Sequence, residues 1–314
     1  EVGEGLGRGQ GDYHEFWAKR GLMDYMEPFR AAVLMAHAFN DWNVVPSHSY
    51  RFIEKLKEIG VPLQIYYHQG GHGGEPPFSM MNRWFTRYLF GVENGVENDT
   101  KAWIVREKDD RLKPTPYADY PNPDALPVTF FLKPGAPASG DLVTEKPAKQ
   151  GTETLVDNFS FTGSMLAQAE YTNHRLLYLT PELTEPAHIS GVVKVKVRAA
   201  SSKPAVNLSV WMVSLPWEES RQMRPTDNII TRGWADLQNH RSMTQSEPLV
   251  PGKFYEMTFE LEPDDQIIPA GKQIGLMIFS SDKEFTLHPD PGTELTIDLD
   301  GTEVTIPIVG GNIK

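Results

Sequence analysis

An aspartate and a histidine in the first quarter of the chain each follow a strand-like apolar run. Asp41 comes directly after "AAVLMAHAFN", and His72 ends the stretch "LQIYYHQGGH". Because the carboxyl ends of parallel strands meet at one edge of a sheet, we expect these two side chains to lie together. A buried carboxylate that accepts the Nδ1–H of an imidazole leaves Nε2 free to take a proton from a hydroxyl group. The pair therefore predicts the acid and the base of a hydrolase with a serine nucleophile.

Other interpretations of these residues remain open. An aspartate after a strand is often a helix N-cap, and a histidine in a glycine loop is often simply solvated. The four-residue spacing of His68 and His72 would suit a metal pair on a helix. The intervening Gln69–Gly71 is poor helix sequence, so we expect no metal and no cofactor. His37 is expected to be a packed histidine at a strand end and not a catalytic one, and the remaining histidines show no partner pattern and are expected to be structural or solvated.

The sequence contains no recognisable nucleophile for this pair. There is no G-x-S-x-G elbow, and Ser139 in "GAPASGD" lacks a strand–turn–helix context and follows the histidine. Acid before histidine is the order of the α/β-hydrolase fold, in which the serine comes first. The chain begins at Glu1 without an initiator methionine or a signal-peptide pattern, and its first residues are typical of a loop. We therefore expect the serine to lie upstream of Glu1 and this chain alone to be inactive.

The first part of the chain alternates strand-like and helical patterns. Apolar spacing predicts a strand over 31–39 buried on both faces, a helix over 46–59 ending at Gly60, a strand over 62–67, and a helix around 81–89 ending at Gly91. This alternation is typical of right-handed βαβ units on a parallel sheet. Residues 1–100 are therefore predicted to be the C-terminal part of an α/β-hydrolase domain.

The second part of the chain, residues 101–314, has a different pattern. About ten strand-like runs, such as "VKVKVRA" and "MTFELE", are separated by clusters of Pro, Gly, Asn and Asp, and no long helix interrupts them. Alternating polar and apolar residues indicate strands buried on one face. The predicted fold class is thus α/β plus all-β, with a jelly-roll β-sandwich as the second domain.

Composition excludes several classes of protein. The 314 residues include 30 basic and 42 acidic side chains, and with no basic stripe in the sequence we expect no nucleic-acid partner. No apolar run approaches the ~20 residues of a membrane span, so we expect a soluble protein of unassigned compartment without membrane association. Cysteine is absent, which excludes disulfides and thiolate metal sites.

Four segments of the first part carry a family resemblance: "FWAKRG" (16–21), "AHAFNDWNVVP" (36–46), "HQGGHGG" (68–74) and "WFTRYLFGVENGVE" (84–97). They are similar to segments of the X-prolyl dipeptidyl aminopeptidases, which belong to a broader group with cocaine-esterase-like acyl hydrolases and α-amino acid ester hydrolases. The second part resembles the jelly-roll domain of that group in "VSLPW" (213–217), "ITRGWADLQNHRS" (230–242) and "IPAGKQIGLMIFSSD" (268–282). The resemblance covers nearly the whole chain.

The resemblance implies a role for three residues of the loop over 40–46, the acid loop. Asp41 matches the acid of the family's triad and His72 its base, whereas Asn43 would face the substrate. Trp42 would contact the substrate or cover the Asp41–His72 bond. The family's nucleophile elbow, oxyanion hole and helical cap are absent from this sequence. The implied activity is the release of X-Pro dipeptides from peptides with proline second from the N-terminus, together with an N-terminal part that carries the serine.

Two alternatives to this activity are retained. The first is an ester or β-lactam acyl hydrolase of the same fold. The second is a non-enzymatic carbohydrate- or protein-binding module, in which Trp211, Trp217 and Trp234 would stack on sugars. Such tryptophans more often pack in a core or between domains, and the second domain could equally shape the cleft or a homo-oligomer.

Overall fold

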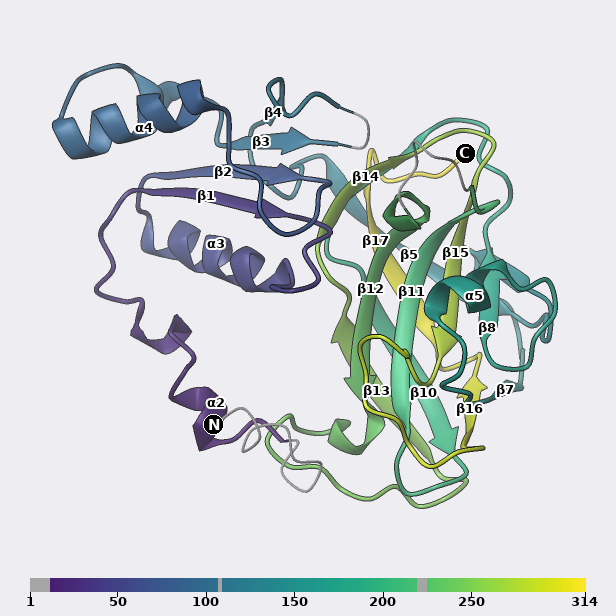
Figure 1. The fold of residues 1–314 in the computed structure, drawn as a ribbon. Coiled ribbons are helices and arrows are strands. Elements are labelled where there is room, and N and C mark those ends of the chain that lie inside the picture. The colour runs from purple at the N-terminus through teal and green to yellow at the C-terminus, as the bar shows by residue number, and fades with distance from the viewer. Residues whose placement is uncertain (1–11, 107–108, 219–224) are drawn as a thin grey trace.

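A computed structural model describes residues 12–106, 109–218 and 225–314 (Figure 1). Residues 1–11 of the predicted N-terminal loop lie outside the described residues. The first part forms a four-stranded sheet with two long helices, and the second forms a large β-domain beside it. The elements of the first part are α2 (Glu15–Ala18), η2 (Met23–Tyr25), β1 (Val33–Ala38), α3 (Ser47–Ile59), β2 (Leu63–His68), α4 (Phe78–Phe90), η3 (Val96–Asn98), β3 (Ala102–Val105) and β4 (Thr115–Tyr117).

The first sheet has the order β1-β2-β3-β4. Strands β1, β2 and β3 are parallel, which confirms the predicted parallel sheet, whereas β4 runs antiparallel to β3. Ala38 pairs with His68 in the register of β1 and β2, so the two strands end side by side. Strands β3 and β4 lie beyond residue 100, and the first sheet therefore continues past the expected domain boundary to Tyr117.

The helix predicted over 46–59 is confirmed as α3. It follows Pro46, whose fixed φ suits a helix start, and it ends at Gly60, which adopts φ +77°. Ile53 on its inner face packs against Ile65 of β2 in the core of the first part. This packing fixes the direction in which the chain enters α3 from the loop after β1.

The burial prediction for β1 is wrong for the described residues, and helix α4 exposes much of its apolar side. Strand β1 was expected to be buried on both faces, but it pairs only with β2, and Ala36 in its middle is exposed. Helix α4 has the expected apolar row, yet only Trp84 is buried, whereas Leu89 and Phe90 are 71% and 78% exposed. Both elements thus expose apolar surface that the sequence patterns assign to a core.

The all-β second part is confirmed. Its strands are mostly antiparallel and surround a large apolar core that includes Val195, Val210 and Ile297, with a smaller apolar cluster around Trp211. Its elements are β5 (Ala125–Lys133), β6 (Gly140–Val143), β7 (Thr152–Val156), α5 (Gly163–Gln168), β8 (Leu176–Leu179), β9 (Ala187–Gly191), β10 (Lys194–Ser201), β11 (Asn207–Leu215), η4 (Pro225–Asn228), β12 (Ile229–Asp236), η5 (Leu237–Asn239), β13 (Phe254–Glu260), β14 (Asp264–Ile268), β15 (Gln273–Phe279), β16 (Glu294–Asp298) and β17 (Glu303–Val309).

Buried polar contacts join the two parts beside the ends of β1 and β2. Gln69 donates from Nε2 to the Asp264 carboxylate and to the Asp265 carbonyl, both at 2.8 Å. Tyr120, fully buried, donates from its hydroxyl to the Asp264 carbonyl at 3.1 Å. The loop after β2 is therefore anchored on the β-domain. Among the described helices, none has the length and apolar character needed to cross a bilayer.

Candidate active site

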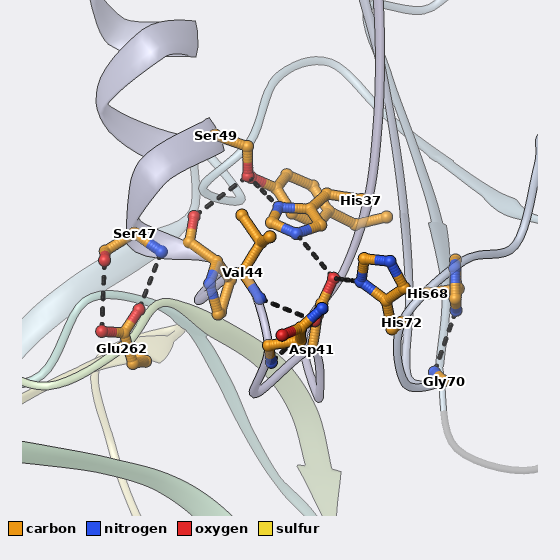
Figure 2. A network of polar contacts seen from close by, with 12 residues as sticks. His37, Asp41, Val44, Ser47, Ser49, His68, Gly70, His72 and Glu262 are labelled. Carbon is orange, nitrogen blue, oxygen red and sulfur yellow. Dashed lines mark hydrogen bonds and ion pairs between the residues drawn. The ribbon is translucent and has the colours of Figure 1, made fainter. Parts of the chain in front are cut away.

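The structure brings Asp41 and His72 into direct contact. Asp41 follows β1, His72 follows β2, and Nδ1 of His72 lies 2.9 Å from Oδ2 of Asp41 (Figure 2). The loops are joined directly beyond the strands, since Asn40 donates its backbone N–H to the Gly70 carbonyl at 3.2 Å. Parallel strand ends therefore carry the two side chains to the same edge of the sheet.

Asp41 is held as an ionised carboxylate. Its side chain is buried, and Oδ1 accepts the backbone N–H groups of Asn43 and Val44, both at 3.0 Å. Burial by itself raises the pKa of Asp41, but the hydrogen bonds from Val44, His72 and Asn43 together bring the pKa below its ordinary value. The carboxylate therefore carries its charge at neutral pH and has a fixed plane.

The His72 imidazole opens toward solvent on the side away from Asp41. Its side chain is 63% exposed, and in the described parts of the chain its Nε2 has no hydrogen-bond partner. A ring with Nδ1–H bound to a carboxylate presents a basic Nε2 lone pair outward. This nitrogen can therefore accept a proton from a hydroxyl group or a water molecule that approaches it from the solvent side.

The glycine loop around His72 depends on His68. The buried His68 accepts the Gly70 N–H on Nδ1 at 2.9 Å. Gly74 has φ +108°, and a Cβ there would lie 2.5 Å from His68 Nε2, so only glycine fits. Burial, together with the nearby Arg111, lowers the pKa of His68. His68 thus supports the loop. In the ranges that the structure describes, no cluster of three or more metal-ligating side chains occurs.

The two predicted substrate-binding residues lie in different surroundings. Asn43 is exposed beside Asp41. Trp42 packs on the β-domain, where the guanidinium carbon of Arg232 lies 3.5 Å from its ring centroid, and Trp234 and Phe285 meet it edge-on at 6.1 Å. Trp42 therefore joins the acid loop to the β-domain, and substrate contact by either residue remains a prediction.

His37 is a site residue that the sequence reasoning missed. It is packed at the strand end as expected, but it also places Nε2 3.3 Å from the Asp41 carboxylate and Nδ1 2.5 Å from the Ser49 hydroxyl. The four-residue spacing from His37 to Asp41 across a strand end was the available signal. No sequence signal indicated Ser49, because its contact with His37 depends on where α3 packs.

Glu262 of the β-domain was also missed. It accepts the Ser47 backbone N–H at 2.7 Å and the Ser47 hydroxyl at 3.1 Å, which caps the first turn of α3. Burial raises the pKa of Glu262, although these two hydrogen bonds oppose the effect. The β-domain thus holds the acid loop at both ends, through Trp42 and through the start of α3.

The sugar-stacking alternative fails for Trp211. This side chain is fully buried and donates its Nε1–H to Asp282 at 3.0 Å. Trp234 donates to the same carboxylate oxygen at 2.9 Å and stacks on Phe285. Trp211 and Trp234 therefore serve packing, as the simpler interpretation predicted. Trp217 is only partly buried.

Comparison with protein families gives two matches along the chain. The family described as the X-Pro dipeptidyl-peptidase C-terminal non-catalytic domain matches residues 94–312. The family described as X-Pro dipeptidyl-peptidase (S15 family) matches residues 7–74, which include both Asp41 and His72.

Similar full-length sequences carry related names. A Rhodopirellula baltica protein, provisionally named an Xaa-Pro dipeptidyl-peptidase, is 60% identical over 98% of this chain and 49% of its own length. An Xaa-Pro dipeptidyl-peptidase of Lactobacillus delbrueckii subsp. lactis is 26% identical over 95% of this chain and 43% of its own length. The chain therefore spans about half the length of the curated relatives it matches.

Solved structures share the fold. An aminopeptidase from a marine sediment Thaumarchaeota archaeon superposes with a TM-score of 0.76 at 14% identity, over 96% of this chain and 59% of that one. A CocE/NonD family hydrolase from Staphylococcus aureus gives a TM-score of 0.70 at 12% identity, over 95% and 57% of the two chains. These similarities confirm an α/β part followed by a mostly antiparallel β-domain.

Proposed function

The chain belongs to the X-Pro dipeptidyl-peptidase S15 family, and on that premise we propose that it supplies the acid and the base of a serine peptidase that releases X-Pro dipeptides. The observation that carries this proposal is the hydrogen bond between buried Asp41 and exposed His72, with Nε2 of the imidazole left open. Cleavage after proline comes from the family and from the names of the relatives.

The proposed mechanism is acyl transfer in two steps. His72 Nε2 takes the proton of a serine hydroxyl while the hydroxyl oxygen attacks the carbonyl carbon of the proline residue. The same nitrogen then gives that proton to the leaving amine, and the C–N bond breaks. In the second step His72 takes a proton from water, the water oxygen attacks the acyl carbon, and the serine oxygen departs with the proton. Asp41 keeps Nδ1 protonated and stabilises the imidazolium that forms.

We also propose that the serine is supplied by an N-terminal part of the catalytic domain that this chain does not contain. The chain spans about half of its relatives, and no serine in the described residues is bonded to His72 Nε2. The open side of β1 and the exposed apolar side chains of α4 offer surface on which such a part can pack. This chain alone is accordingly expected to hydrolyse no peptide.

A chimera tests the proposal. The N-terminal half of the Rhodopirellula baltica relative is joined before residue 1, and the chimera and the isolated chain are assayed with Gly-Pro-p-nitroanilide, Gly-Ala-p-nitroanilide and p-nitrophenyl acetate. We expect the chimera to be active and the isolated chain to be inactive. The chimera should prefer Gly-Pro-p-nitroanilide over Gly-Ala-p-nitroanilide at least tenfold. His72→Ala should abolish activity, and the matched control His48→Ala, on an exposed histidine of α3, should retain it.

Two results would contradict this proposal. Equal activity of the chimera and its His72→Ala variant would remove His72 from the mechanism. Hydrolysis of the ester without hydrolysis of the prolyl substrate would instead favour the ester hydrolase alternative, which the fold alone equally permits.

A further inference from the structure

Asp41 binds a second imidazole that the proposed mechanism does not use. Oδ2 of Asp41 lies 2.9 Å from His72 Nδ1 and 3.3 Å from His37 Nε2, so one oxygen serves both rings (Figure 2). The His37 side chain is only 13% exposed and lies near the end of β1 beside the acid loop. The charge of His37 therefore acts directly on the carboxylate that orients the proposed base.

Hydrogen-bond counting at Ser49 places a proton on His37 Nδ1. The Ser49 oxygen lies 3.0 Å from the Pro46 carbonyl, 2.6 Å from the Tyr67 hydroxyl and 2.5 Å from His37 Nδ1. The Pro46 carbonyl also accepts the Tyr50 backbone N–H at 3.0 Å, and because a carbonyl oxygen only accepts, its contact with Ser49 is a hydrogen bond only if Ser49 donates its single proton there. Both remaining neighbours must then donate to the two lone pairs of the serine oxygen.

The same count at Asp41 places a proton on His37 Nε2. The ionised carboxylate of Asp41 can only accept, so a hydrogen bond at 3.3 Å requires Nε2–H. With Nδ1–H and Nε2–H both present, His37 is an imidazolium. This is the state in which all three contacts of the Ser49 oxygen and the contact between His37 and Asp41 are hydrogen bonds at once.

The other titratable groups facing His37 are consistent with this assignment. Tyr67 stacks against His37 at a centroid distance of 6.2 Å. Burial raises the pKa of Tyr67 well above its ordinary value, which keeps it a hydroxyl donor. His68 also interacts with His37, and burial lowers the pKa of His68, which keeps it neutral. Asp41 is thus the one anion in contact with His37 among the described residues.

We propose that His37 is a positively charged positioning residue for the catalytic acid. It fixes Oδ2 of Asp41 from the side opposite His72 and draws part of the carboxylate charge away from the base. Removing this charge makes Asp41 a stronger partner for protonated His72. The acidic limb of the pH profile should then move to higher pH, by about half a unit for a single charge at a partly hydrated site.

The charge of His37 can be measured in the isolated chain, without reference to activity. Long-range ¹⁵N–¹H spectra at pH 7.5, assigned with His37→Gln, report which ring nitrogens carry protons. We expect both nitrogens of His37 to be protonated. A single protonated nitrogen would overturn the proposal, whatever the chimera does.

The kinetic consequence rests on the proposed function and is tested in the chimera. The pH profile of kcat/KM for Gly-Pro-p-nitroanilide is compared among His37→Gln, Ser49→Ala and the control His48→Gln. We expect the acidic limb to rise by about half a unit in the first two variants, because the first removes the imidazolium and the second removes the acceptor that stabilises its Nδ1–H, and to stay unchanged in the third. Loss of activity without any displacement of the limb would reduce His37 to a packing role and overturn the proposal. An inactive chimera would count against the proposed function, while the spectra would still decide the charge of His37.

Discussion

Asp41 in the first part and Asp282 in the β-domain are two buried aspartates whose pKa values are shifted in opposite directions. Each accepts two side-chain N–H groups on Oδ2, from two imidazoles at Asp41 and from the indoles of Trp211 and Trp234 at Asp282. The pKa of Asp41 is lowered, whereas burial raises the pKa of Asp282 despite its two indole donors. Burial alone therefore does not decide which carboxylate is readily ionised.

The difference lies in what surrounds each carboxylate. Asp41 has two backbone N–H donors and an exposed imidazole beside it, so solvent and dipoles support its charge. Asp282 lies among aromatic rings, and its nearby cation is Arg232, which is itself buried against Trp42 and Phe285. Burial lowers the pKa of Arg232 to about 10. The first site fits the proposed role of Asp41 as the acid beside His72, and the second holds the acid loop on the β-domain.

The largest expected difference is in activity. In the chimera, Asp41→Asn should lower kcat/KM for the prolyl substrate by roughly 10⁴, because an amide does not hold the Nδ1–H tautomer or stabilise the imidazolium. Asp282→Asn keeps an oxygen acceptor for the indoles and should change kcat/KM by less than about tenfold. Equal losses in the two variants would erase the distinction between the sites.

A smaller effect is expected from Arg232. Arg232→Met keeps apolar packing against Trp42 but leaves Asp282 without its cation, and should lower the free energy of unfolding by about 2 kcal/mol at pH 7. The loss should be smaller at pH 4 than at pH 7, because burial raises the pKa of Asp282 and it takes up a proton at higher pH than an ordinary aspartate. Urea unfolding followed by tryptophan fluorescence measures both values, with the exposed Arg241→Met as the matched control. A loss that is the same at both pH values would contradict the assignment of charge to this pair.

The smallest expected effect is on the pH dependence of the unfolding free energy, to which the two aspartates contribute slopes of opposite sign. Because the folded-state pKa of Asp41 is lowered, its contribution to stability is present above pH 3.8 and is lost as pH falls through the lowered value. Because the folded-state pKa of Asp282 is raised, stability falls as pH rises from 3.8 through the raised value. In unfolding free energies measured from pH 3 to 6, Asp41→Asn should remove the increase in stability with rising pH. Asp282→Asn should remove the decrease in stability with rising pH. Slopes of the same sign would contradict the comparison.

The sequence was informative where the controlling interactions are local. The helix over 46–59, its end at Gly60 and the parallel strands before Asp41 and His72 follow from nearby residues, and all are present. The meeting of Asp41 and His72 followed from strand order alone, because parallel strands end at one edge.

The sequence was uninformative where distant segments meet. Glu262 caps Ser47 across 215 residues, and Arg232 of the β-domain covers Trp42 of the acid loop, and no local pattern specifies either contact. The role of His37 was missed because it depends on Ser49, which reaches it only once α3 packs on the sheet. Burial of β1 was overestimated because an apolar run does not specify which strands border it.

The tautomer of His72 in the isolated chain tests the central claim most directly. Long-range ¹⁵N–¹H spectra at pH 9 report which nitrogen carries the proton, and Asp41→Asn provides the comparison. Our account predicts a proton fixed on Nδ1 and a lone pair on Nε2, with this preference lost in Asp41→Asn. A proton on Nε2, or the same mixture of tautomers with and without the carboxylate, would contradict it.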